Sequence, residues 1–291
     1  MLYFIQIFIM VVIVGWLLKT KKVSWNSFWT IFTIALITVD IIEIFINLIF
    51  NLYKFPTNIL SNPDKDNFLG ILCADSVILP LTAIVFCYCV KSHPFKTSIF
   101  FTIVYTFLEW IYLKLEYLIY LNWKLYYSVL AYLIGFSFFS RYANKLIDRP
   151  YKVPYYISIT CFAYFTLVIP GAIPDVLLNM HNWRPGLAQD FWVDDRITDL
   201  GSCLVIANIV GLIIPRIPVK YKKLSFSVLA ILSVSFGLIS YFNGWLIYNK
   251  WNHFLTIIRY CLPFLILYFY DKWQVKLRFI PNNVLQRGKQ I

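Results

Sequence analysis

The chain alternates between long apolar runs and short polar connections over almost its whole length. The first run, residues 2–18, has no basic residue before it and three lysines, Lys19, Lys21 and Lys22, directly after it. A secretory signal peptide has the opposite arrangement, so this run is predicted to be a retained membrane span. Eight further apolar runs lie at about 25–50, 68–90, 97–121, 123–140, 154–173, 199–215, 224–247 and 254–270. A helix needs about 20 such residues to cross a bilayer, so the pattern predicts an all-α polytopic membrane protein with nine transmembrane helices.

The Lys and Arg residues are divided unequally between the two sets of connections. Alternate connections, from residues 19–22 to the tail that starts at 271, carry eighteen of them, whereas the other set carries six. Cytoplasmic connections hold the excess of basic residues, so the N-terminus is predicted outside and the C-terminus in the cytoplasm. Tryptophans that flank the runs, Trp123 and Trp251 among them, are interpreted as anchors at the membrane surface. The same bias explains the net charge of +12, and no nucleic-acid partner is expected.

Composition agrees with this fold class. Hydrophobic residues make up 60% of the chain and charged residues 14%, with a mean hydropathy of +0.70. A soluble domain of this length could not cover so much apolar surface, whereas a bilayer does. The six cysteines show neither a zinc spacing nor a disulfide pattern. HExxH, GxSxG and P-loop motifs do not occur, so no catalytic residue, metal or cofactor is predicted.

A set of landmark residues occurs twice at nearly constant spacing. The landmarks of the first and second copy are Asp75, Pro94, Lys96, Tyr120 and Trp123 against Asp199, Pro218, Lys220, Tyr248 and Trp251. Each copy holds about four apolar runs, an even number, so both copies would enter the membrane in the same direction. The predicted organisation is a lead helix (1–22), a first four-span repeat (23–150), a second four-span repeat (151–273) and a basic cytoplasmic tail (274–291).

Charged residues inside spans are the best candidates for function, because each costs about 2.5–3.5 kcal/mol at mid-bilayer unless it is paired or hydrated. Two spans of the first copy carry polar side chains along one helical face. These faces comprise Asp40, Glu43, Asn47 and Asn51 in one span, and Tyr105, Glu109, Tyr112, Glu116 and Tyr120 in the other. Asp75 and Asp199 are predicted at the outer ends of their spans, and Arg259 just inside the outer end of the last span.

All these charges fall in the outer half of the membrane in the predicted topology, which indicates a polar cavity open to the outside. The second copy has glycine or serine near the positions that match Glu109 and Glu116, and it has Arg259 where the first copy has Ala131. We therefore expect Arg259 to pair with carboxylates of the first copy, because an unpaired buried carboxylate is unfavourable. The alternative is that these groups only hold helices together, as polar side chains commonly do between spans.

A group of aspartates, Asp190, Asp194, Asp195 and Asp199, suggests a site for a hard divalent cation. Aspartate-rich motifs of membrane prenyltransferases look faintly similar. A second such motif does not occur, and the group lies in the predicted outer connection. An ordinary solvated loop is therefore the preferred interpretation.

Part of the first copy resembles the small four-span membrane proteins common in spore-forming, low-GC Gram-positive bacteria. The resemblance covers about residues 30–145 and is carried by Asp75, Pro80, Pro94, Glu109, Glu116, Trp123 and Lys124. The second copy keeps Asp199, Pro218 and Trp251 but lacks both glutamates. The resemblance implies a bacterial plasma membrane as the location, and it implies no activity.

Three classes of function remain open on the sequence. The leading one is a non-enzymatic transporter, channel or sensor with an outward-facing acidic cavity for a cation, a proton or a small polar solute. The second is a scaffold or partner subunit of a larger membrane or envelope complex, which would bind another membrane protein or a second copy of itself. The third is a lipid-modifying enzyme of the outer leaflet, which would require a metal at the aspartate-rich loop.

Overall fold

The structure is a computed structural model, and it describes residues 2–90 and 93–279. The α-helices are α1 (Leu2–Lys19), α2 (Trp25–Glu43), α3 (Pro63–Ile71), α4 (Leu79–Cys89), α5 (Pro94–Lys114), α6 (Leu125–Asp148), α7 (Tyr155–Ala172), α8 (Phe191–Ile213), α9 (Val219–Phe242) and α10 (His253–Phe279). The π-helical segments are η1 (Ile44–Ile49), η2 (Leu72–Ile78) and η4 (Ile173–Leu177), and the 3₁₀ segments are η3 (Pro150–Lys152) and η5 (Ile214–Arg216). The strands are β1 (Tyr53–Lys54), β2 (Ile119–Tyr120), β3 (His181–Trp183) and β4 (Leu246–Tyr248).

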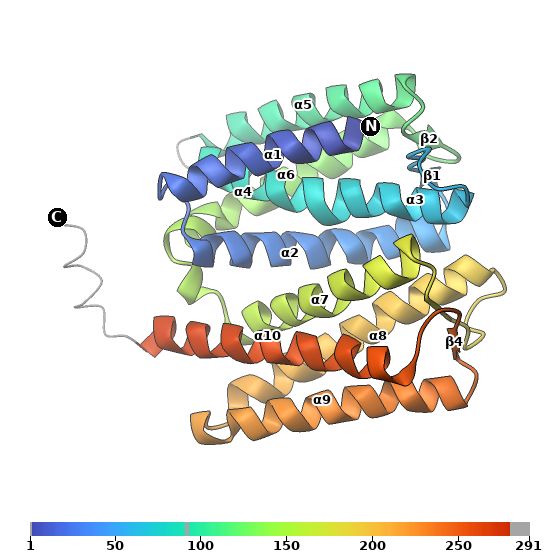
Figure 1. The fold of residues 1–291 in the computed structure, drawn as a ribbon. Coiled ribbons are helices and arrows are strands. Elements are labelled where there is room, and N and C mark those ends of the chain that lie inside the picture. Colours follow the sequence, from blue (N-terminus) through green and yellow to red (C-terminus); the bar gives the residue numbers. More distant parts are fainter. Residues whose placement is uncertain (1, 91–92, 280–291) are drawn as a thin grey trace.

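The helices lie side by side in a bundle, with the strands β1, β2 and β4 at one end, here called the strand end (Figure 1). Within the described residues, seven helices are long and apolar enough to cross a membrane, which agrees with an all-α membrane protein. They span Leu2–Lys19, Trp25–Ile49, Pro63–Cys89, Tyr155–Leu177, Phe191–Arg216, Val219–Phe242 and His253–Arg278. Helices α5 and α6 are of similar length, 21 and 24 residues, and are not among the seven.

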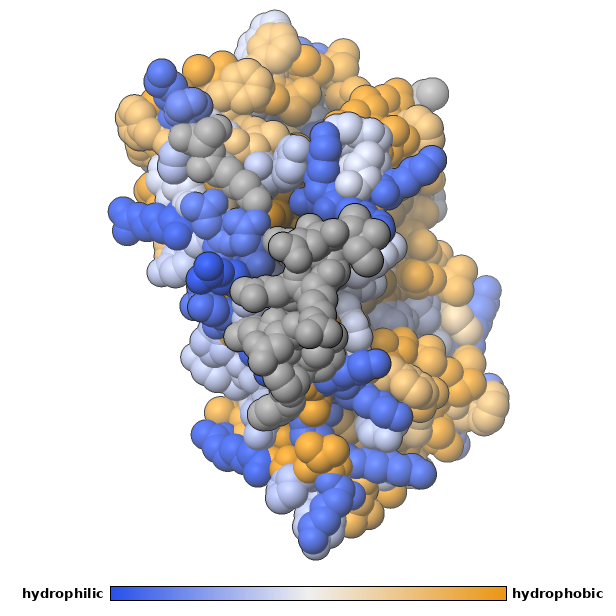
Figure 2. All heavy atoms as spheres, turned by 90° about the vertical axis from the view of Figure 1, so that its left-hand side faces the viewer, coloured by the Kyte–Doolittle hydropathy of each residue, from blue (hydrophilic) through white to orange (hydrophobic). Residues whose placement is uncertain are grey.

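The end opposite the strands is polar, whereas the flanks are not. Figure 2 views this opposite end and shows hydrophilic side chains across it, with hydrophobic side chains along the sides of the bundle. Many large apolar residues on the flanks are exposed, for example Phe8 at 69% and Ile134 at 69%. A belt of exposed apolar side chains between polar ends is the surface that a bilayer covers. Of the predicted basic tail, 280–291 lie outside the described residues.

Several predicted boundaries differ from the structure. The run at 97–121 was expected to be one span, but α5 ends at Lys114 and the chain then forms β2. The seventh span was expected to start at residue 199, whereas α8 starts at Phe191. The reason is local capping, since the side chain of Asp190 accepts hydrogen bonds from the backbone N–H of Trp192 and Val193 and so starts the helix in the polar stretch.

The same succession of elements occurs in the first half (residues 25–148) and the second half (residues 155–279). In each half a helix ends in a π-helical turn, a strand follows, and then come two helices or helical segments, a second strand and a last helix. The two strands pair antiparallel within each half, with Tyr53 opposite Tyr120 and His181 opposite Tyr248. Both strand pairs therefore close off the strand end in the same way.

Several hydrogen bonds recur with both partners moved by 128 positions, as from Ser128 to Thr256. The backbone pairs are Leu121 N and Asn122 N to Leu52 O, against Asn249 N and Lys250 N to Met180 O. The pairs that involve side chains are Phe55 N to Asn67 Oδ1 against Trp183 N to Asp195 Oδ1, and Trp123 Nε1 to Ser128 Oγ against Trp251 Nε1 to Thr256 Oγ1. These contacts provide a residue-by-residue correspondence between the halves around the strand end.

The halves pack against each other along α2 and α7 (Figure 1). The ring of Trp29 lies 5.4 Å from those of both Phe162 and Phe165, and Gln274 Nε2 donates to Asn26 Oδ1 at 2.7 Å. Each half also has a large buried apolar core, and a smaller cluster joins Phe68 and Ile71 of the first half to Val176 of the second. Because lipid is as apolar as these side chains, close packing and a few polar contacts hold such an interface.

Candidate functional site

A cavity of about 270 Å³, here called the first-half cavity, lies between α1 and the elements α2, η2, α5 and α6 of the first half. Three carboxylates line it: Glu43, Asp75 and Glu109, which are 8%, 4% and 8% exposed. The rest of the wall is largely aromatic and apolar, and includes Tyr3, Tyr53, Tyr105, Tyr112, Trp123, Tyr132 and Phe136. Within the described part of the chain, none of the three carboxylates forms an ion pair with Lys, Arg or His. The cavity is therefore acidic and has no cation of its own there.

Glu43 is placed at the cavity by the change of helix type at the end of α2. The helix continues past Glu43 as the π-helical turn η1, and the chain then reverses into β1. The hydroxyl of Tyr53 on β1 donates to Glu43 Oε1. Burial raises the pKa of Tyr53 well above its usual 10, and the negative charge of Glu43 nearby raises it further. The phenol therefore stays a neutral donor. Glu43 Oε2 has no hydrogen-bond partner in the described residues.

Glu109 is held from the strand end. Its Oε1 accepts hydrogen bonds from Ser128 Oγ at 2.6 Å and from the hydroxyl of Tyr120 on β2. Trp123 Nε1 in turn donates to Ser128 Oγ at 2.7 Å. Trp123, interpreted from the sequence as an anchor at the membrane surface, thus also supports Glu109 through its indole N–H.

Asp75 lies inside η2, in the middle of the continuous helix formed by α3, η2 and α4, and not at the end of a span as expected. Its Oδ2 has no hydrogen-bond partner in the described residues. Asp40 is one turn before Glu43 and accepts a hydrogen bond from Ser76 Oγ at 3.1 Å. It lines a smaller space next to Glu43 and not the main cavity. π-Helical turns inside α-helices are common at functional sites; here η1 directly follows Glu43 and η2 contains Asp75.

The matching place in the second half is filled by Arg259. Its Nη2 donates to Asp199 Oδ1 at 2.8 Å and its Nη1 to the carbonyl oxygen of Leu167 at 2.9 Å. Gly171, which corresponds to Glu43, leaves the room for this guanidinium, because a Cβ at that position would lie 2.3 Å from Arg259 Nη2. The expected pair between Arg259 and carboxylates of the first half is therefore wrong, since the arginine is bound within its own half.

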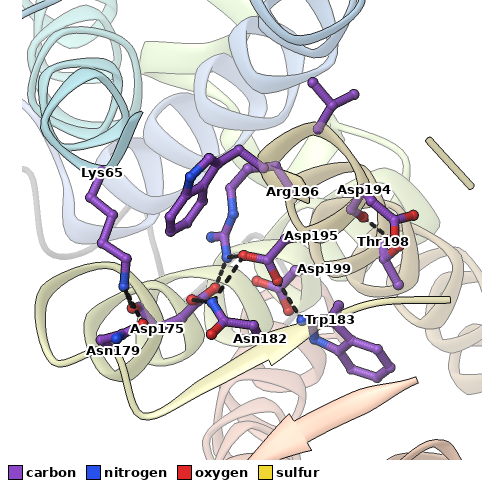
Figure 3. A network of polar contacts seen from close by, with 12 residues as sticks. Lys65, Asp175, Asn179, Asn182, Trp183, Asp194, Asp195, Arg196, Thr198 and Asp199 are labelled. Carbon is purple, nitrogen blue, oxygen red and sulfur yellow. Dashed lines mark hydrogen bonds and ion pairs between the residues drawn. The ribbon is translucent and has the colours of Figure 1, made fainter. Parts of the chain in front are cut away.

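A second ionic network lies near the strand end of the second half. Figure 3 shows the Arg196 guanidinium between Asp175 and Asp195, all three of them at most 2% exposed. Lys65 reaches this network from α3 of the first half, and its Nζ donates to Asn179 Oδ1 at 2.5 Å and to the carbonyl oxygen of Asp175 at 3.2 Å. Arg196 and Lys65 are among the six basic residues of the predicted outer connections. The structure buries both.

The aspartates of the 190–199 segment each have a structural partner. Asp190 caps α8, and Asp194 accepts hydrogen bonds from the backbone N–H groups of Gly186, Leu187 and Ala188. Asp195 and Asp199 form the ion pairs described above. Among the residues that the structure describes, no group of three or more His, Cys, Asp or Glu side chains could hold a metal ion.

Two tyrosines and one glutamate of the predicted polar face behave differently from one another. Tyr105 shares a hydrogen bond with Thr82, Tyr112 donates to Gln6 on α1, and both tyrosines line the cavity. Glu116 does not, because α5 ends at Lys114 and Glu116 follows in a left-handed conformation with φ 58°. Its side chain is exposed and lies outside the cavity lining.

Comparison with known proteins adds no family. No family model, curated protein or solved structure matches this chain.

Proposed function

We propose that this chain is a multi-pass membrane protein whose first-half cavity binds a cation or a small cationic solute, as a transporter, channel or sensor. The observation that carries the proposal is the set of three buried carboxylates, Glu43, Asp75 and Glu109, around one cavity without a cation among the described residues. Like charges around one low-dielectric cavity repel one another. A bound cation or protons would relieve that repulsion, and ionisable groups inside spans commonly mark such pathways.

The proposal includes nine spans, with α5 and α6 added to the seven most apolar helices. Both helices are long enough, and part of their polarity consists of residues that face the cavity, such as Glu109 and Ser128. The basic connections favour a topology with the N-terminus outside, in which the strand end and the carboxylates would lie toward the outer surface. The bacterial plasma membrane is the location that the resemblance of the first copy favours.

We also propose that the two halves are copies of one unit that have diverged. The recurring hydrogen bonds and the two strand pairs support a common architecture. The differences include the polar centre, where Glu43, Glu109 and Ala131 of the first half correspond to Gly171, Gly237 and Arg259 of the second. On this proposal the second half stabilises the protein and the first half carries the ligand.

A flux measurement tests the proposal. Purified protein in proteoliposomes is expected to conduct protons or monovalent cations under an imposed gradient, and Glu109→Gln is expected to remove that flux while leaving the melting temperature unchanged. Glu116→Gln is the matched control, because Glu116 is an exposed carboxylate outside the cavity. A sensor would bind cations without flux, which a cation-dependent shift in melting temperature detects. The absence of both flux and a cation-dependent shift in melting temperature would refute the proposal.

A scaffold is the second candidate, and the second half gives it specific support. Its buried charges, Arg196 and Arg259 with their aspartates, already have partners, as expected of groups that only hold helices together. A scaffold predicts that mutations at the polar clusters alter assembly, and that the protein copurifies with another membrane protein. Copurification of a stoichiometric partner together with the absence of cation binding would favour this second candidate.

A further inference from the structure

The cavity of the first half opens on the flank of the bundle, between α2 and α6. Its lining includes Thr38 and Ile42 on α2 and Ala131 on α6, and all three are exposed; Ile42 is 47% exposed. These residues lie within their helices, where the surrounding surface is apolar and a bilayer would cover it. The cavity is therefore accessible from the side.

We call the line of contact between α2 and α6 the seam of the first half. The corresponding seam of the second half, between α7 and α10, is closed. Thr166, which corresponds to Thr38, is 2% exposed, and Arg259, which corresponds to Ala131, is 6% exposed. The methylene chain of Arg259 extends from α10 and delivers the guanidinium to Asp199. An arginine side chain thus occupies in one half the space that is empty in the other.

We propose that the first-half cavity binds organic cations with a guanidinium or amine head and a short apolar body, which reach it from the bilayer between α2 and α6. This inference rests on the proposed cation-binding function and specifies its ligand. In chemical terms the ligand takes the place of the side chain of Arg259, with its head among the carboxylates and its body against the aromatic wall. The volume of about 270 Å³ suits a small molecule, since pockets for drug-sized ligands have about 300–1,000 Å³.

The free carboxylate oxygens determine which head group fits. Glu43 Oε1 already accepts a hydrogen bond from Tyr53, whereas Glu43 Oε2 and Asp75 Oδ2 have no partner in the described residues. A buried acceptor left without a donor costs about 1–3 kcal/mol, more when it is charged. A guanidinium offers five N–H donors and an ammonium three, whereas a trimethylammonium group has none. Affinity is therefore expected to fall in that order.

Titration calorimetry on the full chain in lipid nanodiscs, with hexylguanidinium as the probe, tests the head group. Binding is expected for wild type, at least tenfold weaker binding of hexyltrimethylammonium, and at least tenfold weaker binding of hexylguanidinium to Asp75→Asn. Ala131→Arg should abolish binding by supplying the guanidinium from α6, as Arg259 does from α10. Glu116→Gln should bind as wild type does. Absence of hexylguanidinium binding to wild type, or equal binding to Asp75→Asn, would overturn the inference.

The route is tested by the rate of association. Ile42→Trp places a larger side chain at the seam and should slow association of hexylguanidinium severalfold while leaving that of the free guanidinium ion unchanged. Equal slowing of both probes would rule out access from the bilayer. The proposed function can survive these failures: if Na⁺ or K⁺ shifts the melting temperature and no organic cation binds, only the inference about the ligand falls. If neither kind of cation binds and the proteoliposomes show no flux, both proposals fall.

Discussion

Removal of the Arg259 side chain is the sharpest test of how the second half is held together. Arg259→Ala deletes both its hydrogen bond to the carbonyl oxygen of Leu167 and its ion pair with Asp199, whose side chain is 2% exposed. The variant also makes the second half resemble the first, which has Ala131 at the corresponding position. Asp199 would then be a buried charge without the partner that it has in the wild type.

The expected loss follows from that burial. Removing one partner of a buried ion pair costs about 3–5 kcal/mol, since the remaining charge stays desolvated and unpaired. In a protein of 150–250 residues, 1 kcal/mol corresponds to a shift of about 2–4 °C in melting temperature. Arg259→Ala is therefore expected to lower the melting temperature by about 6–20 °C.

The assay is thermal unfolding in detergent, followed by the fluorescence of the ten tryptophans. Asp199→Asn and the double variant complete a mutant cycle, in which about 1–3 kcal/mol of the loss should disappear once the aspartate is neutral. Ethylguanidinium at millimolar concentration should restore part of the stability of Arg259→Ala, because it fits the vacated space. Lys250→Ala, at an exposed lysine, is the control. A loss below about 1 kcal/mol, or a double variant that equals the sum of the single ones, would refute the reasoning.

Two further predictions concern the same half. Burial is the main cause, and repulsion from Arg259 the second, of a lowered pKa of His181, from its usual 6.5 to about 4. Between about pH 6.5 and pH 4 this imidazole is therefore protonated in the unfolded state and neutral in the folded state. The free energy of unfolding should fall as pH drops below about 6.5, by about 2 kcal/mol at pH 5. His181→Phe should remove this part of the pH dependence in thermal unfolding, and an identical pH profile would contradict the assignment. Gly171→Ala should destabilise the protein by about 1–3 kcal/mol, because the added Cβ would displace the guanidinium of Arg259. Gly201→Ala, where the added Cβ has open space, should not destabilise it. Equal melting temperatures of the two variants would exclude this steric explanation.

The sequence by itself determined the fold class and the residues that make the halves differ. Apolar runs of span length predict membrane helices, because the backbone hydrogen bonds in the hydrocarbon core must be satisfied within each single stretch of chain. The sequence also showed that Ala131 and Arg259 occupy equivalent positions in the two copies, and it gave Glu43 and Glu109 as candidates on helical faces. Such patterns are local, and a spacing along the chain is enough to recognise them.

Only the tertiary structure decided where each helix ends and which charges meet. Glu116 fits the helical spacing of Glu109, yet the turn after Lys114 removes it from the face. Several acids were within plausible reach of Arg259, and the packing of α7 against both α10 and α8 brings it to Asp199. Apolar helix surfaces are nearly interchangeable as partners, so the sequence of one helix does not specify its neighbour. The partner is determined by close packing at small residues such as Gly171, and that depends on segments far apart in the chain.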